Sequence, residues 1–333
     1  MPKVLVIILN YRTAEMTLRA AEQAVAAMTD LDAELTIVDN ASGDGSAETI
    51  ARALAAAPWA DPARVRLIRS EVNGGFGAGN NIAMRAGMMD GSRPDYVYLL
   101  NSDAFPEPDA IARLVTHLET HPEAGFAGSS TVGEDGALQV TAFRFPTLWS
   151  EFEGAIRTGP FTRLFQRFVV PMGVLDRNTS VDWLAGASMM MRQSVLDEIG
   201  LFDETFFLYF EETELCLRAV RAGYEMHFVL ESRVKHIGAV STGMKTWARV
   251  PKYWLDSRWY YFAKAYGRGY AALATVMHLL GGIGWRVRAL IQRKAFVDPP
   301  RFLWDMAAHD LRALLGRPSE TVRAQQRLRA PTE

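Results

Sequence analysis

Val4-Leu5-Val6-Ile7-Ile8-Leu9 is a continuous apolar run rich in β-branched residues, and it decides the fold class of this chain. Such a run predicts a strand that is buried on both faces of a parallel sheet. Further strands are expected at 35–38, 65–68 and 96–100. Between these runs we expect helices over 13–28, with Thr13 as a candidate N-cap, over 47–57 and over 80–89. Strands that alternate with helices in this way predict a doubly wound α/β sheet.

Polar residues lie just past the ends of the predicted strands. Asn10, Asp39, Asn73 and Asp103 each occupy such a position. Ligands of doubly wound sheets bind outside the carboxyl ends of the strands, so all four residues are expected to line one crevice. The alternative is that polar residues simply populate the loops.

The later part of the chain is less regular. Short strands are expected at 125–129, 181–191 and 224–229, with an aromatic, helical or irregular stretch at 147–168. Residues 245–315 read as mostly helical, and the tail from about 317 as disordered. The apolar run 270–285 is too short and too rich in glycine to span a bilayer, which leaves interfacial docking or core packing.

Composition sets the broad class of the protein. The chain has 333 residues, of which 49% are hydrophobic and 22% charged, with a formal net charge of -2. It predicts an ordinary globular protein with no nucleic-acid partner. Residues 264–333 carry 12 Lys and Arg against 5 Asp and Glu, which suits either contact with an anionic membrane surface or a solvated basic tail. The single cysteine, Cys216, excludes an internal disulfide and favours a cytoplasmic protein.

Three carboxylates stand directly behind the aromatic run Phe206-Phe207-Leu208-Tyr209-Phe210. They are Glu211, Glu212 and Glu214. Acids at the end of a buried run suggest a general base at the rim of a pocket. The competing interpretation is a helix start, since glutamate is favoured in the first turn of a helix.

The segment Asn73-Gly74-Gly75-Phe76-Gly77-Ala78-Gly79-Asn80-Asn81 predicts a flexible turn at a helix start. Such a turn suits close approach by a phosphate or a sugar, although a purely structural turn remains open. The segment does not match the dinucleotide motif G-x-G-x-x-G, and the chain has no G-x-x-x-x-G-K-[ST] sequence. These absences disfavour a dehydrogenase and a P-loop enzyme.

Two residues have the chemistry of metal ligands. Asp103 can bind a hard divalent cation that bridges a diphosphate. His236 adds a nitrogen ligand that suits Mn²⁺ better than Mg²⁺, although an isolated histidine is more often structural. Asp39, at the end of a buried strand, can accept a hydrogen bond from the imide N–H of a nucleotide base.

Taken in order, these motifs resemble the inverting glycosyltransferases of family 2, especially the bacterial rhamnosyltransferase-like branch. The resemblance covers about residues 3–240. It rests on segments 8–11, 38–42, 73–81, 100–103, 183–187 and 210–212.

The resemblance implies a GT-A fold of doubly wound mixed sheet and helices over residues 1–240. Beyond it we expect a mainly helical C-terminal region over 241–333 for acceptor or membrane contact. It also implies a nucleotide-diphosphate sugar donor, a divalent metal (Mn²⁺ or Mg²⁺) and direct displacement at the anomeric carbon. Implied donor-binding residues are Asn10, Tyr11, Asp39, Asn73, Gly74, Gly75, Asn80, Asn101, Ser102 and Asp103.

The resemblance assigns further roles. Asp103 matches the last aspartate of the Asp-x-Asp metal motif, whose first position is Asn101 here, and His236 matches the histidine that completes metal or diphosphate binding. Glu212 matches the general base, with Glu211 as the other candidate. Trp183, Gly186 and Ala187 would shape the sugar and acceptor pocket, and a structural role for Trp183 is the alternative.

We therefore expect a cytoplasmic glycosyltransferase, associated with the inner face of the membrane, that moves a sugar to a lipid-linked or polysaccharide acceptor. Rhamnose from dTDP-rhamnose is the candidate donor. A sugar nucleotidyltransferase is one rival; it needs a glycine-rich N-terminal loop, whereas Leu9-Asn10-Tyr11-Arg12 has no glycine. A non-catalytic protein that binds sugar nucleotides or carbohydrate is the other.

Overall fold

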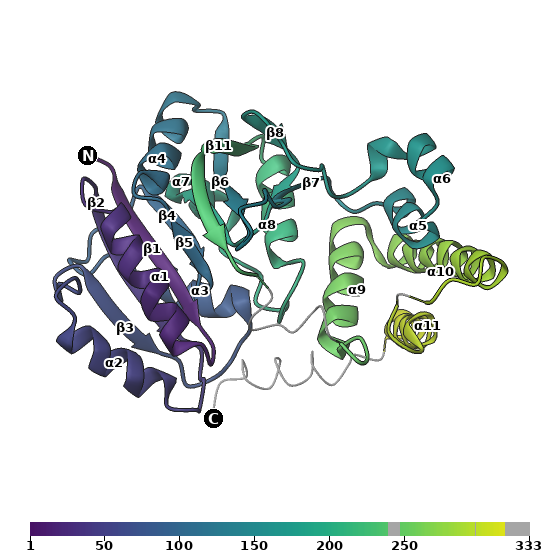
Figure 1. Ribbon diagram of the computed structural model, residues 1–333, viewed down its shortest axis with the longest axis horizontal. Coiled ribbons are helices and arrows are strands. Elements are labelled where there is room, and N and C mark those ends of the chain that lie inside the picture. The colour runs from purple at the N-terminus through teal and green to yellow at the C-terminus, as the bar shows by residue number, and fades with distance from the viewer. Residues whose placement is uncertain (239–246, 297, 317–333) are drawn as a thin grey trace. The chain divides into compact units, whose positions relative to one another are not determined.

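The computed structural model describes residues 1–238, 247–296 and 298–316 (Figure 1). The described chain forms two compact units. Unit 1 contains residues 1–143, 172–204 and 211–238, and unit 2 contains residues 144–171, 205–210 and the described residues from 247 onward. The predicted disorder from about 317 lies outside the described residues.

Unit 1 is built on a nine-stranded mixed sheet. Its strand order is β3-β2-β1-β4-β10-β6-β11-β5, with β8 paired to β11. β1 to β4 are parallel, β10 is antiparallel to both of its neighbours, and β5 is antiparallel to β11. The strands are β1 Lys3–Asn10, β2 Asp32–Asp39, β3 Val65–Arg69, β4 Tyr96–Asn101, β5 Ala104–Pro106, β6 Ala124–Val132, β8 Thr179–Val181, β10 Ser188–Arg192 and β11 Glu225–His236. A separate two-stranded antiparallel sheet pairs β7 (Ala142–Phe143) with β9 (Trp183–Leu184).

Helices flank the sheet of unit 1 (Figure 1). They are α1 Ala14–Ala27, α2 Ser46–Ala56, α3 Phe76–Ala86, α4 Ala110–Thr120, α7 Gln193–Ile199 and α8 Glu211–Arg221. Side chains alternate along β1, so Val4, Val6 and Ile8 join the core cluster with α1, α2 and α4. Leu9 points the other way and packs against α3. The predicted mixed α/β fold of sheet and flanking helices is confirmed.

Two predicted boundaries were wrong. Helix α3 begins at Phe76, within the glycine segment, and not at residue 80. Residues 181–191 form no single strand, because the chain leaves β9 at Leu184 and enters β10 only at Ser188. Gly75, with a φ of 92°, directly precedes α3, and Gly186 lies in the turn between β9 and β10, where its N–H meets Glu212.

Unit 2 is helical. Its helices are α5 Leu148–Ile156, α6 Gly159–Leu164, the 3-10 turn η1 Gln166–Phe168, α9 Lys252–Tyr266, α10 Arg268–Ile291 and α11 Phe302–Leu314. Leu255 of α9 and Leu303 and Met306 of α11 share a small core. In the described residues, no helix is both long and apolar enough to cross a membrane.

A buried ionic network ties the helices of unit 2 together. The Arg258 guanidinium, 1% exposed, lies 2.7 Å from Glu151 Oε2 and 3.0 Å from Asp310 Oδ2. His309 bridges Asp310 and Asp256 at 2.7 Å on each side. Since removing one partner would leave a buried charge unpaired, this network fixes α5, α9 and α11 against one another.

Candidate functional site

The end of β1 and the end of β2 hold a closed polar cluster. Asn10 Nδ2 donates to Asp39 Oδ1 at 2.6 Å, and Ser42 Oγ donates to the same oxygen at 2.6 Å. The backbone N–H of Ser42 donates to Asp39 Oδ2 at 3.2 Å. Parallel pairing sets Asn10 directly beside Asp39, which explains how residues 29 positions apart meet. The cluster orients the Asp39 carboxylate at the carboxyl end of the sheet.

Asn40 connects this cluster to the glycine segment. Its Nδ2 donates to Asn73 Oδ1 at 3.0 Å and to the Gly75 carbonyl at 3.1 Å. Gly75 has a φ of 92°, in the left-handed region that favours glycine. The second and third predicted strand ends therefore lie together, as expected.

Several glycines of this segment also have a packing role. A Cβ at Gly79 would lie 2.5 Å from Leu9 Cδ1, and one at Gly74 would lie 2.7 Å from Ala78 Cβ. Asn80 is buried and donates to the Phe76 carbonyl at 2.9 Å, within α3 itself. Glycine here lets α3 pack closely on β1, and a donor-binding role for Asn80 stays a prediction.

Asp103 and His236 face each other across the pairing of β5 with β11. Ala104 and His236 are register partners, and this brings His236 Nε2 to 3.3 Å from Asp103 Oδ1. Asp103 is buried, and His236 Nε2 is buried without a hydrogen-bond partner among the described residues. A buried ring nitrogen normally has a partner, and the polar atom facing this one is the Asp103 carboxylate oxygen.

This pair fits a divalent cation. Two ligands at right angles on an ion with bonds of about 2.1–2.2 Å are about 3 Å apart, close to the observed separation. Within the described residues, no group of three or more His, Cys, Asp or Glu side chains could hold a metal. A cation held here would thus take its other ligands from water and phosphate, the usual arrangement for Mg²⁺ and Mn²⁺ at a diphosphate.

Glu212 lies in the first turn of α8, where its carboxylate faces the loop before β10. Glu212 Oε1 accepts the Gly186 N–H at 3.3 Å. A Cβ on Gly186 would lie 2.9 Å from that oxygen. Burial raises the pKa of Glu212 above its ordinary 4.5, although the Gly186 N–H opposes the shift. A half-buried carboxylate with a raised pKa has the properties of a general base.

The neighbouring acids have different surroundings. Glu211 is fully buried, and its Oε2 has no hydrogen-bond partner among the described residues. Burial, followed by the charge of Glu212, raises the pKa of Glu211 well above its ordinary value. Glu214 pairs with Arg218 at 2.9 Å, and Arg218 also donates to the Leu201 carbonyl at 2.7 Å. Only Glu212 combines partial exposure with a raised pKa.

Short contacts join these parts within unit 1. A Cβ added to Gly186 would lie 3.1 Å from the ring of Phe76, the residue after Gly75. The Asn101 N–H donates to the Ala187 carbonyl at 3.0 Å. On the other side, Thr13 Oγ1 donates to Ser102 Oγ at 3.2 Å. The residues predicted from separate motifs thus form one connected strip.

Two predicted residues lie at its margin. Tyr11 is half-buried, with the Arg12 guanidinium 5.1 Å from its ring centre. Trp183 is half-buried and stacks on Phe143, with ring centres 4.3 Å apart and planes at 17°. Their predicted roles toward nucleotide and sugar stay predictions.

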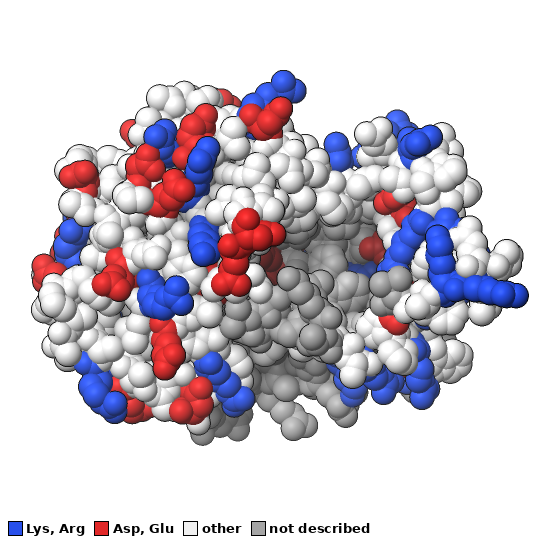
Figure 2. Space-filling model, viewed as in Figure 1, with Lys and Arg blue, Asp and Glu red and all other residues white. Residues whose placement is uncertain are grey.

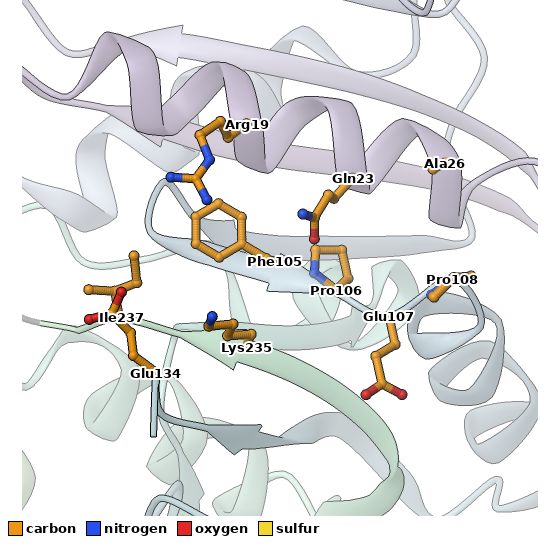
Figure 3. A pocket seen from close by; sticks show the side chains of 10 residues that line it. All are labelled: Arg19, Gln23, Ala26, Phe105, Pro106, Glu107, Pro108, Glu134, Lys235 and Ile237. Carbon is orange, nitrogen blue, oxygen red and sulfur yellow. The ribbon is translucent and has the colours of Figure 1, made fainter. Parts of the chain in front are cut away.

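A surface cavity of about 420 Å³ lies between α1, β5 and β11 (Figure 3). In Figure 3, Arg19 of α1 lies over Phe105, with Lys235 on the facing strand. Arg19, Gln23, Glu134 and Lys235 are exposed, and no predicted site residue lines the cavity. The candidate site is therefore the strip described above and not this cavity.

Comparison with known proteins decides the family. A sequence model described as "Glycosyltransferase like family 2" matches residues 2–261. The chain belongs to glycosyltransferase family 2. Both compact parts of the candidate site, at Asp39 and at Glu212, fall inside the matched range.

Rhamnosyltransferases are among the family 2 relatives. The chain is 30% identical over 228 residues to N-acetylglucosaminyl-diphospho-decaprenol L-rhamnosyltransferase of Mycobacterium tuberculosis, covering 65% of this chain and 70% of that protein. It is 31% identical over 159 residues to rhamnosyltransferase WbbL of Escherichia coli K12, covering 46% of this chain and 58% of that protein. The solved structure of S. aureus TarS residues 1–349 has a TM-score of 0.51 at 13% identity, covering 97% of this chain and 83% of TarS, which shows a shared fold.

Sequence reasoning from single motifs missed two members of the site. Ser42 joins Asp39 and Asn10 and also accepts the Arg12 N–H at 3.0 Å. Asn40 links the cluster to the glycine segment. Asn40 directly follows Asp39 and Ser42 lies three residues after it, so their place just past the end of β2 was the signal that could have identified them.

Proposed function

We propose that this chain is an inverting glycosyltransferase with Glu212 as its general base. It would move a sugar from a nucleotide-diphosphate donor to the hydroxyl of an acceptor. Membership of glycosyltransferase family 2 supports transfer of a glycosyl group. The observation that supports the mechanism is the half-buried Glu212 carboxylate, oriented by the Gly186 N–H and raised in pKa by burial.

The reaction assigned to Glu212 is a single displacement. Its carboxylate takes the proton from the acceptor hydroxyl while that oxygen forms a bond to the anomeric carbon. The bond between that carbon and the diphosphate oxygen breaks, and the nucleoside diphosphate leaves with the electron pair. Attack opposite to the leaving group inverts the anomeric configuration.

The donor would lie along the strip from Asp39 to Asp103. Asp39, held by Asn10 and Ser42, would accept a base N–H, while Asn73, Gly74, Gly75, Asn101 and Ser102 line the path to the diphosphate. Asp103 and His236 would hold Mn²⁺ or Mg²⁺ at the diphosphate. The bound cation supplies positive charge that stabilises the departing phosphate oxygens.

The relatives narrow the substrates. Two of them are named rhamnosyltransferases, and the name of the mycobacterial protein includes a diphospho-decaprenol acceptor. We therefore infer that the donor is dTDP-rhamnose, which supplies rhamnose. The inferred acceptor is a lipid-linked glycan, and a polysaccharide is the alternative. With a lipid-linked acceptor the enzyme would work at a membrane surface, and we propose that this is the inner face.

The Glu212→Gln variant tests the proposal. We expect it to bind the donor within about twofold of wild type while kcat falls about 10²- to 10⁴-fold, the usual contribution of a general base. Isothermal titration with dTDP-rhamnose and release of dTDP in the presence of a polyprenyl-diphospho-sugar acceptor give the two quantities. In wild type, kcat/KM should fall as the pH falls through the raised pKa of Glu212.

Glu211→Gln is the matched control because it changes the adjacent buried acid in the same way. It should keep most of the activity. Full activity of Glu212→Gln would refute Glu212 as the base, and loss confined to Glu211→Gln would transfer the role to Glu211. Donor binding without transfer by wild type, over a panel of acceptors, would favour the non-catalytic alternative.

A further inference from the structure

Helix α10 exposes its large apolar side chains. Leu273, Val276, Leu280, Ile283, Val287 and Leu290 are each between 47% and 67% exposed. They are spaced alternately by three and four residues, which at 3.6 residues per turn places them in one stripe about 100° wide. We call this stripe the α10 face. A helix packed on a protein core normally buries such a stripe.

The side of α10 opposite the stripe is buried and carries mostly small residues. A Cβ on Gly281 would lie 2.6 Å from the Phe152 carbonyl of α5, and one on Gly282 would lie 2.8 Å from Leu303 of α11. Ala271, Ala274 and Ala289 are also buried. Within unit 2, α10 therefore packs through small residues and Trp285, which is 7% exposed, and the large apolar side chains of the stripe are left outside.

The charge around the α10 face has one sign. In the described residues 264–296 and 298–316, every exposed charged side chain is basic. These are Lys264, Arg268, Arg293, Lys294, Arg301 and Arg312. The acids of the same segment are Asp298, Asp305 and Asp310, each paired with an arginine and at most 10% exposed. Figure 2 shows Lys and Arg gathered over this part of unit 2.

We propose that the α10 face docks on an anionic lipid surface, with the apolar stripe in the headgroup region and the basic side chains against lipid phosphates. A stripe of Leu, Ile and Val with Arg and Lys around it is the composition of an interfacial helix. A second copy of the chain fits less well, because it would bring a surface of the same positive charge against the first. The exposure and charge of the α10 face are observed independently of the reaction. Only the expectation that the enzyme meets a membrane rests on the proposed function.

Binding to vesicles, without donor or acceptor, tests the proposal independently of the reaction. Wild type should cosediment with vesicles of phosphatidylcholine and phosphatidylglycerol (70:30), and at least about tenfold less with phosphatidylcholine alone. Leu280→Glu combined with Ile283→Glu should weaken binding at least about tenfold. Arg293→Gln with Lys294→Gln should weaken it about 25-fold at low salt, or about fivefold per lost charge.

A matched control lies in unit 1. Val220 is 38% exposed on α8, so Val220→Glu should leave vesicle binding within twofold of wild type. A dye on Ile283→Cys should report an apolar environment when vesicles are added, whereas a dye on Val220→Cys should not. The native Cys216 is buried and should stay unlabelled. The unfolding temperature of each variant shows whether it is folded.

Three results would overturn the proposal. One is equal binding of wild type and the Leu280→Glu, Ile283→Glu variant. Another is a dye response at Val220→Cys and none at Ile283→Cys. The third is a wild-type dimer without lipid that the double variant converts to a monomer, which would assign the α10 face to a second copy.

Discussion

Gly186→Ala offers a sharp test of how the position of Glu212 is set. The new Cβ would lie 2.9 Å from Glu212 Oε1 and 3.1 Å from its Cγ, whereas ordinary contact begins at 3.4 Å. The carboxylate must therefore move by about 0.5 Å, the limit to which productive geometry is usually held. The backbone of Gly186 lies outside the left-handed region, so alanine adds no backbone strain.

We expect Gly186→Ala to slow the reaction rather than to weaken donor binding. Since a displacement of about 1 Å can cost about 100-fold in rate, half that distance should lower kcat about tenfold, equivalent to about 1.4 kcal/mol in the barrier. The KM for the donor should change little. Because the Gly186 N–H lowers the pKa of Glu212, weakening that contact should also move the acid limb of the pH profile to higher pH.

Steady-state rates from pH 5 to 9, together with the free energy of unfolding, measure these effects. Gly154→Ala is the control: Gly154 is exposed on α5, and a Cβ there would meet nothing within 4 Å. It should leave kcat unchanged and stabilise the helix by up to about 1 kcal/mol. A Gly186→Ala enzyme with wild-type kcat and an unmoved acid limb would refute the role assigned to the contact between Gly186 and Glu212.

Three further outcomes are expected. Since folding raises the pKa of Glu211, the wild-type protein loses stability as the pH rises above 4.5 towards the raised value. The Glu211→Gln variant should not show this loss. In urea unfolding it should be about 1–3 kcal/mol more stable than wild type at pH 8, with little difference at pH 4. Asp103→Ala should weaken Mn²⁺ binding at least about tenfold in titrations with dTDP present, and undiminished affinity would exclude Asp103 as a ligand. Burial lowers the pKa of His309, but the hydrogen bonds of His309 to Asp256 and Asp310 outweigh burial and raise the pKa to about 9. The protonated histidine should therefore stabilise the fold by on the order of 3 kcal/mol below pH 6.5, and this stability should be lost as the pH rises through 9. His309→Gln should flatten that dependence, and an unchanged slope would contradict it.

The fold and the family were determined by the sequence. The segments that became β1 to β4 alternate with helical segments, and those of β1, β2 and β4 are largely apolar, so local pattern and final structure agree. The strand-end positions of Asn10 and Asp39 were predictable for the same reason, because parallel strands bring their carboxyl ends to one edge. The predicted membership of glycosyltransferase family 2 is confirmed.

Side-chain surroundings were decided only by the tertiary structure. Glu211, Glu212 and Glu214 look alike in sequence, yet the first is fully buried, the second meets Gly186 and the third pairs with Arg218. Burial raises the pKa of Glu211 and of Glu212, and the sequence alone does not show which side chains are buried. Likewise, the run 270–285 left docking and packing open until the contacts of Gly281 and Gly282 showed which side of α10 is buried. Local pattern fixes an element, but only packing fixes which of its faces meets protein and which is left for a ligand or a membrane.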